Sequence, residues 1–126
     1  MEINRRIKPC PIDRNPLEDT LKLYIVVRSD LPPGSQLAQS CHAMRLWAQE
    51  HPVIDQFWYL KSNNLVVLQV PDEICLKHLA SRVSDAGIAC SVFREPDFGN
   101  SITALAIEPA GKKLLSNLRL ALKSAA

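Results

Sequence analysis

The chain has 126 residues, of which 47% are hydrophobic and 22% are charged, as is usual for one globular domain. This composition excludes a disordered tail and a collagen-like repeat. Fifteen Lys and Arg against thirteen Asp and Glu leave a net charge of +2. That charge is too small to indicate a nucleic-acid-binding protein by itself.

Cysteine spacing and the length of the apolar runs predict the cellular location. The four cysteines form no C-x-x-C pair, which favours free thiols in a reduced compartment. The first fifteen residues contain no apolar stretch of signal-peptide length. No run approaches the roughly 18 residues that a membrane helix needs. We therefore expect a soluble cytoplasmic protein that does not bind a membrane.

Two regions differ in their patterning. Prolines and charges without periodicity predict an extended arm over residues 1–20, and residues 21–126 are expected to form a single α/β domain. Hydrophobic periodicity predicts, in chain order, a strand over 21–28, helices over 35–50 and 53–60, and a strand over 65–70. A helix capped by Asp72 follows over 72–86, then strands over 88–94 and 101–107, and a last helix containing Leu114, Leu115, Leu118 and Leu122.

This order of elements predicts a three-layer fold, with a four-stranded mixed sheet and helices on both faces. Residues 65–70 are almost continuously apolar, so we expect this strand to be buried on both faces. The last two strands are joined by a short loop and are compatible with an antiparallel hairpin.

Helix 35–50 has two expected features. Ser35 is a good N-cap. The stripe of Leu37, Cys41, Met44 and Ala48 is expected to face the core, whereas Gln36, Gln39 and Arg45 lie off it.

Ligands in open α/β sheets gather beyond the carboxyl ends of the strands. The first strand ends at Arg28 and continues through Asp30 and a Gly34 turn that could offer backbone N–H groups to an anion. The third strand ends near Glu95 and Asp97, close to a polar cluster of Asn100, Ser101 and Thr103. A carboxylate beside hydroxyl and guanidinium donors can act as a general base for water. The structural alternatives are an Arg28–Asp30 ion pair and an ordinary solvated loop.

Other reactive residues are interpreted as structural. Cys41 and His42 are adjacent on a helix and cannot face each other, and Cys75 with His78 lacks the further ligands that zinc needs. We expect no metal site and no cofactor. The aromatic residues Trp47, Phe57, Trp58 and Tyr59 are interpreted as core or as a subunit contact, so a homodimer is a further expectation. Basic residues near both ends of the chain, Arg5, Arg6, Lys8, Lys112, Lys113, Arg119 and Lys123, could add weak attraction for phosphate.

Several motifs resemble the type 2 peptidyl-tRNA hydrolase family. Residues 23–31 (LYIVVRSDL), Gly34 and residues 38–43 (AQSCHA) are similar to its strand ending V-R-x-D-L, its glycine turn and its helix bearing A-Q-x-x-H-A. Residues 70–73 (VPDE) resemble its A-P-D-E segment, and residues 101–109 resemble its S-Q-T-x-x-x-I-G-P strand. The resemblance extends roughly from Lys22 to Leu120, and the A-Q-x-C-H-A helix is nearest to the divergent peptidyl-tRNA hydrolase domain-containing subgroup.

The resemblance implies hydrolysis of the ester that joins a peptide to the 3′ end of tRNA, without a metal. The family's catalytic set is a Lys in the turn before the helix, an Asp after the third strand, and nearby Thr residues. Here Ser35 falls at the Lys position, and Glu95 or Asp97 stands only approximately for the Asp. Thr103 matches the last Thr of the set. The residues that match the family directly at candidate substrate-binding positions are Arg28, Asp30, Gln39 and His42.

Three interpretations follow. The first is a peptidyl-tRNA hydrolase-like esterase, in which Glu95 or Asp97 orients water and Thr103 holds the substrate carbonyl or ribose. Arg28 and the turn of Gly34 and Ser35 would then receive negative charge. The second is a catalytically weak or inactive homologue that binds a tRNA end, a nucleotide or a protein. A homodimeric scaffold with an interface at residues 57–59 is a third interpretation. The expected partner of the first two is the 3′ end of tRNA, bound weakly.

Overall fold

A computed structural model describes residues 21–123 of the chain. The arm predicted over residues 1–20 therefore lies outside the described residues. The elements in chain order are β1 (Lys22–Arg28), α2 (Pro33–Glu50), α3 (Pro52–Lys61), β2 (Asn64–Val70), α4 (Glu73–Asp85), β3 (Cys90–Glu95), the short 3₁₀ helix η3 (Pro96–Phe98), β4 (Ser101–Ile107), the 3₁₀ helix η4 (Pro109–Leu115) and β5 (Arg119–Leu120).

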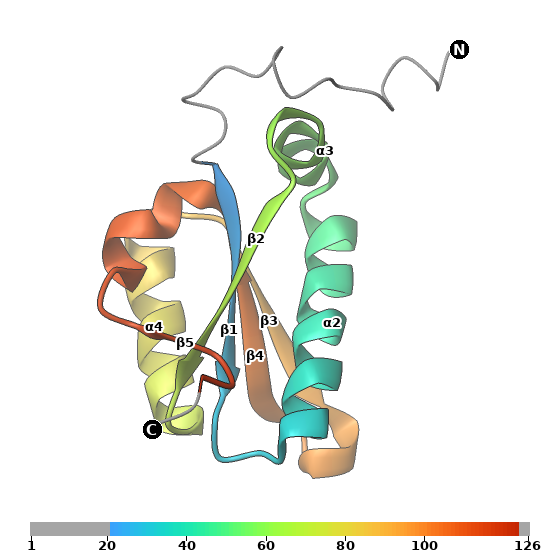
Figure 1. Cartoon of the computed structure of the whole chain (residues 1–126), viewed down its shortest axis with the longest axis vertical. Coiled ribbons are helices and arrows are strands. Elements are labelled where there is room, and N and C mark those ends of the chain that lie inside the picture. Colours follow the sequence, from blue (N-terminus) through green and yellow to red (C-terminus); the bar gives the residue numbers. More distant parts are fainter. Residues whose placement is uncertain (1–20, 124–126) are drawn as a thin grey trace.

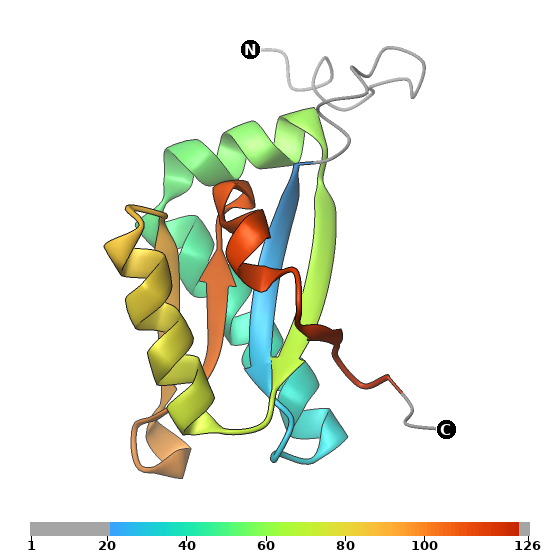
Figure 2. The same cartoon turned by 90° about the vertical axis from the view of Figure 1, so that its left-hand side faces the viewer.

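The sheet has five strands in the order β3-β4-β1-β2-β5. β1 and β2 are parallel, whereas β4 runs antiparallel to both β1 and β3. The hairpin alternative for the last two predicted strands is therefore confirmed. The central strand, β1, is buried on both faces over residues 23–27, because helices cover both sides of the sheet (Figures 1 and 2).

Two apolar clusters fill the space on either side of the sheet. On the α4 side, even-numbered β1 residues such as Val26 pack with Leu76, Leu105 and Leu115. On the α2 side, odd-numbered β1 residues such as Ile25 pack with Trp47 and Trp58. The alternation follows from the two-residue period of a strand, and it confirms the expected three layers.

The prediction of four strands is wrong, because a fifth replaces the expected last helix. Only η4 is helical, and its leucines pack into the α4-side cluster. The chain then turns outward at Ser116 and Asn117, and β5 pairs antiparallel with Leu68 and Gln69 at the edge of β2. This pairing satisfies backbone groups that would otherwise lie unpaired at the end of the sheet.

The prediction of which face of α2 is buried is also wrong. The buried residues are Gln36, Gln39, Ala43 and Trp47, whereas Leu37 is 59% exposed and Cys41 is exposed. The small residues Ala104 and Ala106 of β4 make room for the Trp47 indole. The Gln39 amide contacts Glu95 of β3 and Thr103 of β4, whereas the Gln36 amide donates to carbonyls of the β1–α2 loop.

Strand β2 is less buried than its sequence predicts. Helix α2 packs mainly on β3, β4 and β1, and Leu65, near the start of β2, is 46% exposed. The four aromatic residues are partly buried and partly exposed. Trp47 and Trp58 are core residues, while Phe57 and Tyr59 are about half exposed, and a subunit contact through them stays a prediction. No helix among residues 21–123 is long and apolar enough to cross a membrane.

Gly111 gives a test of core packing. A Cβ at this position would lie 2.6 Å from Cγ2 of Ile107, a fully buried side chain of β4. We expect Gly111→Ala to lower the free energy of unfolding by about 1–3 kcal/mol, measured by urea denaturation. Gly34→Ala is the matched control, since among residues 21–123 no heavy atom outside its own helix and chain neighbours lies within 4 Å of its Cβ position, and it should be neutral or slightly stabilising. Equal stability of the two variants would contradict this account of the η4–β4 contact.

Candidate active site at the carboxyl edge of the sheet

The strand directions bring the predicted site residues to one edge. β1, β2 and β3 point the same way, so their last residues, Arg28, Val70 and Glu95, lie at the same end of the sheet. β4 begins there with Ser101. Arg28 and Glu95 therefore lie at the same edge of the sheet, with the start of β4 between them.

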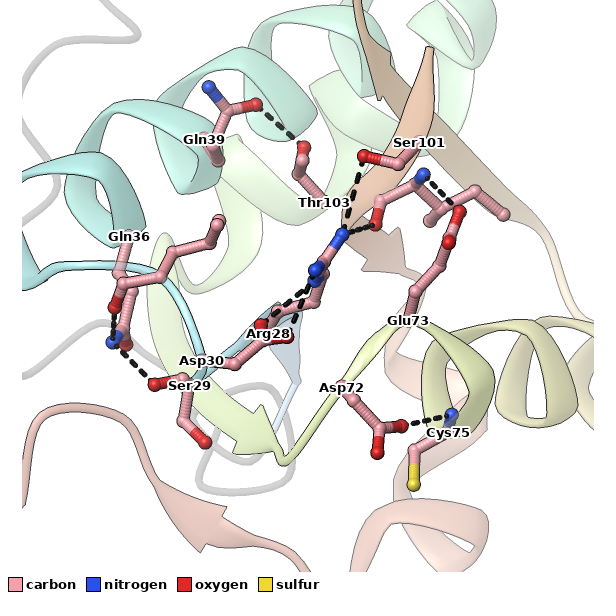
Figure 3. Close-up of polar contacts among 12 residues, drawn as sticks. Arg28, Ser29, Asp30, Gln36, Gln39, Asp72, Glu73, Cys75, Ser101 and Thr103 are labelled. Carbon is pink, nitrogen blue, oxygen red and sulfur yellow. Dashed lines mark hydrogen bonds and ion pairs between the residues drawn. The ribbon is translucent and has the colours of Figure 1, made fainter. Parts of the chain in front are cut away.

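Arg28 is held by four hydrogen bonds (Figure 3). Its Nε and Nη2 donate to the two carboxylate oxygens of Asp30, each at 2.9 Å. Its Nη1 donates to Ser101 Oγ and to the carbonyl of Ile102, each at 3.3 Å. The hydrogen bond with Asp30 raises the pKa of the guanidinium above its ordinary value. Arg28 thus joins β1 to β4, and Asp30 already balances its charge.

A buried relay of side chains joins α2 to β3 and β4. Thr103 Oγ1 donates to Gln39 Oε1 at 2.6 Å, and Gln39 Nε2 donates to Glu95 Oε1 at 2.8 Å. All three residues are buried, Thr103 completely. Because the Thr103 proton lies on the Gln39 amide, the Thr103 oxygen has only lone pairs left to offer. The role expected for Thr103, holding the substrate carbonyl or ribose, stays a prediction; in this arrangement its hydroxyl is engaged with Gln39.

Glu95 is the inward-facing carboxylate of the two candidates. Its Oε2 accepts a hydrogen bond from the backbone N–H of Asp97 at 3.1 Å, and the Asp97 side chain is exposed. The Gln39 amide, followed by the Asp97 N–H, lowers the pKa of Glu95, and His42 contributes further by its charge. Glu95 is thus an anion at neutral pH.

The first turn of α2 lies one turn before Gln39. The helix begins at Pro33 after Pro32, and no side chain caps it, so the prediction of Ser35 as N-cap is wrong. Proline suits the first helical position because its fixed φ is already helical. Gly34 and Ser35 carry N–H groups with no carbonyl of the helix to bind, and Ser35 lies four residues before Gln39, on the same face.

His42 lies one turn after Gln39, on the exposed side of α2. Its ring stacks on Phe93 of β3, with the centroids 4.9 Å apart and an angle of 18° between the planes. This contact fixes the ring near Glu95 but away from Cys41, as expected for adjacent helix residues.

Two residues that shape the site were absent from the predicted set. Glu73 Oε2 accepts a hydrogen bond from the backbone N–H of Ile102 at 2.8 Å, next to Thr103. Gln36 Nε2 donates to the carbonyls of Leu31 and Ser29, at 2.7 and 3.3 Å, and so holds the β1–α2 loop. The signal for Gln36 was its spacing, since it shares a helical stripe with Trp47, a large apolar residue.

The remaining polar groups at this edge of the sheet are a helix cap and no cluster of metal ligands among the described residues. Asp72 caps α4 as the sequence predicts, because its Oδ1 accepts from the backbone N–H of Cys75 at 2.9 Å. Within residues 21–123, no three His, Cys, Asp or Glu side chains gather as metal ligands. The arrangement offers an ionised carboxylate, a neutralised guanidinium and the N–H groups at the start of a long helix.

An ionised carboxylate and the start of a long helix thus lie together at the carboxyl edge of a mixed α/β sheet. Residues 21–125 match the family described as peptidyl-tRNA hydrolase PTH2, and the chain belongs to this family. A solved structure from Agrobacterium tumefaciens strain C58, described as a protein of unknown function, has the same fold with a TM-score of 0.59. The two are 17% identical over 80% of this chain and 97% of the other. No curated protein matches the chain.

The lowered pKa of Glu95 predicts a pH effect on stability. Its contribution to stability is fully present above the unfolded-state pKa, about 4.3, and is lost as the pH falls through the lower folded value. We expect wild type to be more stable than Glu95→Gln at pH 7, with a difference that shrinks below about pH 4.3. Urea denaturation from pH 7 to pH 3 measures this. Asp97→Asn should follow the wild-type curve, and a gap that stays constant with pH would contradict the assignment.

Proposed function

We propose that the chain hydrolyses the ester between a peptidyl or N-blocked aminoacyl group and the 3′-terminal ribose of tRNA. The observation that carries this proposal is the position of Glu95, an ionised carboxylate held beside the first turns of α2 by Gln39. The family of the chain supports the class of reaction.

Each group has a proposed role in the reaction. Glu95 orients the attacking water through the lone pairs that Gln39 and Asp97 leave free. The N–H groups of Gly34 and Ser35, together with the Ser35 hydroxyl, receive the charge that develops on the carbonyl oxygen. Arg28 and Asp30 shape the wall between β1 and β4, and His42 flanks the site from α2. Gln39 and Thr103 act through Glu95 as positioning residues.

Two features predict a slow enzyme. A carboxylate with a lowered pKa is a weak base, whereas general bases work best with a pKa near the operating pH. Ser35 also stands where family members carry a Lys, and a neutral donor forms hydrogen bonds roughly half as strong as those of a charged one.

A binding module without catalysis is the second candidate. It is favoured by the closed polar network, since Asp30 balances Arg28 and the Thr103 proton is already donated. Such a module would hold the acyl-adenosine end of tRNA without cleaving it. In either case we propose a cytoplasmic protein, with Phe57 and Tyr59 available for contact with a second copy.

The hydrolase proposal predicts a strong effect at Glu95. We expect Glu95→Gln to lower the rate of release from N-blocked aminoacyl-tRNA by about 10²–10⁴-fold, because the carboxylate that orients water is lost. Asp97→Asn is the matched control and should keep the wild-type rate. If wild type releases nothing at protein concentrations near that of the tRNA, the hydrolase proposal is contradicted and the binding module is the remaining candidate. Equal rates for wild type and Glu95→Gln would discard this site.

The missing positive charge predicts a gain of function. Ser35→Lys places an ammonium at the first turn of α2, where it can stabilise the developing oxyanion. We expect release to accelerate by about 10², the usual effect of one oxyanion donor. Ser35→Met, of similar length without the charge, is the control. Acceleration in both variants, or in neither, would show that charge at residue 35 does not limit the reaction.

A further inference from the structure

The small net charge of the chain conceals an uneven distribution. Residues 109–123 contain four Lys and Arg and no Asp or Glu, whereas residues 21–108 contain seven Lys and Arg against nine Asp and Glu. The last part of the described chain therefore carries +4 and the rest of the domain carries −2. We call Lys112, Lys113, Arg119 and Lys123 the basic strip.

The side chains of the basic strip are available to a partner. All four residues are exposed, and within the described residues none of them forms an ion pair. By contrast, Arg28 at the candidate site is only 15% exposed and is paired with Asp30. The strip thus holds uncompensated positive charge on a domain that is otherwise slightly acidic.

The strip runs along the sheet toward the candidate site. η4 follows β4 at the end of the sheet opposite the site, and the chain then passes beside β2 to β5 (Figure 2). Arg119 pairs with Gln69, which pairs with Val27, the residue before Arg28. Two strand spacings, about 10 Å, therefore separate the Arg119 backbone from the end of β1.

A hollow of about 280 Å³ separates the basic strip from α4. Its lining includes Val70 and Pro71 at the carboxyl end of β2, Leu118 beside Arg119, and His78 with Arg82 on α4. Arg82 is exposed and adds a positive charge on the opposite wall. The nearby acids Asp72 and Glu73 are engaged with backbone N–H groups of Cys75 and Ile102.

We propose that the basic strip, with Arg82 across the hollow, binds the phosphate backbone of the tRNA acceptor arm and so delivers the 3′ end to the carboxyl edge of the sheet. This inference rests on the proposed function for its partner. A polyanion is favoured because the strip is a row of cations without acids, whose long side chains suit phosphates along a strand. A row of this kind reads no sequence, as expected for a protein that accepts many tRNAs.

Binding of labelled deacylated tRNA at several salt concentrations tests the strip. The variant Lys112→Gln/Lys113→Gln/Arg119→Gln/Lys123→Gln removes four charges, and Lys22→Glu/Arg45→Glu makes the same change in net charge elsewhere, with Arg45 on α2 at the other face of the sheet. We expect the quadruple variant to bind at least about tenfold more weakly at low salt. Its slope of log K against log[salt] should fall by about three, since each phosphate contact contributes roughly 0.7–0.9. The control should resemble wild type. If circular dichroism shows that the quadruple variant is unfolded, the double variants Lys112→Gln/Lys113→Gln and Arg119→Gln/Lys123→Gln replace it in the binding assay.

Hydrolysis of two substrates separates this inference from the hydrolase proposal. On N-blocked aminoacyl-adenosine, which lacks the stem, the quadruple variant should match wild type, and on N-blocked aminoacyl-tRNA its KM should rise. Absence of hydrolysis with tRNA binding lost only in the strip variant would overturn the hydrolase and support the strip. Equal tRNA binding by strip and control variants, or none by wild type at low salt, would overturn the strip whatever the hydrolysis result.

Discussion

The hydrogen bond from Gln39 to Glu95 is the constraint on which the site depends. An ionised carboxylate only accepts hydrogen bonds, so it fixes which end of the amide faces it. The amide oxygen must then turn toward Thr103, and the Thr103 hydroxyl must donate its proton there. One buried charge therefore decides the orientation of two neutral side chains and joins α2 to β3 and β4. Buried polar groups of this kind are stable only when each has a partner, so the three elements are held in a single arrangement.

The same constraint explains why the first turns of helix α2 bury polar residues and its later turns bury apolar ones. Its first two turns bury Gln36 and Gln39 over the polar end of the sheet, and its later turns bury Ala43 and Trp47 over alanines of β4. The residues that resemble a catalytic family at this edge are consequently also those that attach the helix. Packing and hydrogen bonding therefore give these residues a structural role in addition to any role in the chemistry. In the proposed reaction, Glu95 and Ser35 act directly, whereas Gln39 and Thr103 act through Glu95.

Most strands and helices could be predicted because their patterns were local. The strand at 101–107, the Asp72 cap and the helix at 53–60 depend on alternation, on a capping side chain and on proline, and the structure has them at or near the predicted residues. The buried face of α2 could not be found from hydrophobicity alone, because partners distant in the sequence make glutamine the buried residue there. The prediction of a last helix was wrong for a related reason. The spacing of Leu114, Leu115, Leu118 and Leu122 suits a helix, but the open edge of β2 recruits part of that segment as β5. The choice between Glu95 and Asp97 depended on a 3₁₀ turn that only the backbone shows.

The late position of β4 in the chain has a consequence for how the protein is made. β4 lies between β1 and β3, yet both of those strands leave the ribosome before it, and they run in the same direction with no direct pairing. The bonds that complete the site join residues 64 and 73 positions apart, so none of them can form until β4 has been synthesised. Pairings of this separation form slowly. A nascent chain that stops before residue 101 would leave the facing edges of β1 and β3 unpaired, and it would lack Ser101 and Thr103, the β4 partners of Arg28 and Gln39. The proposed site would therefore be complete only when the whole sheet has formed.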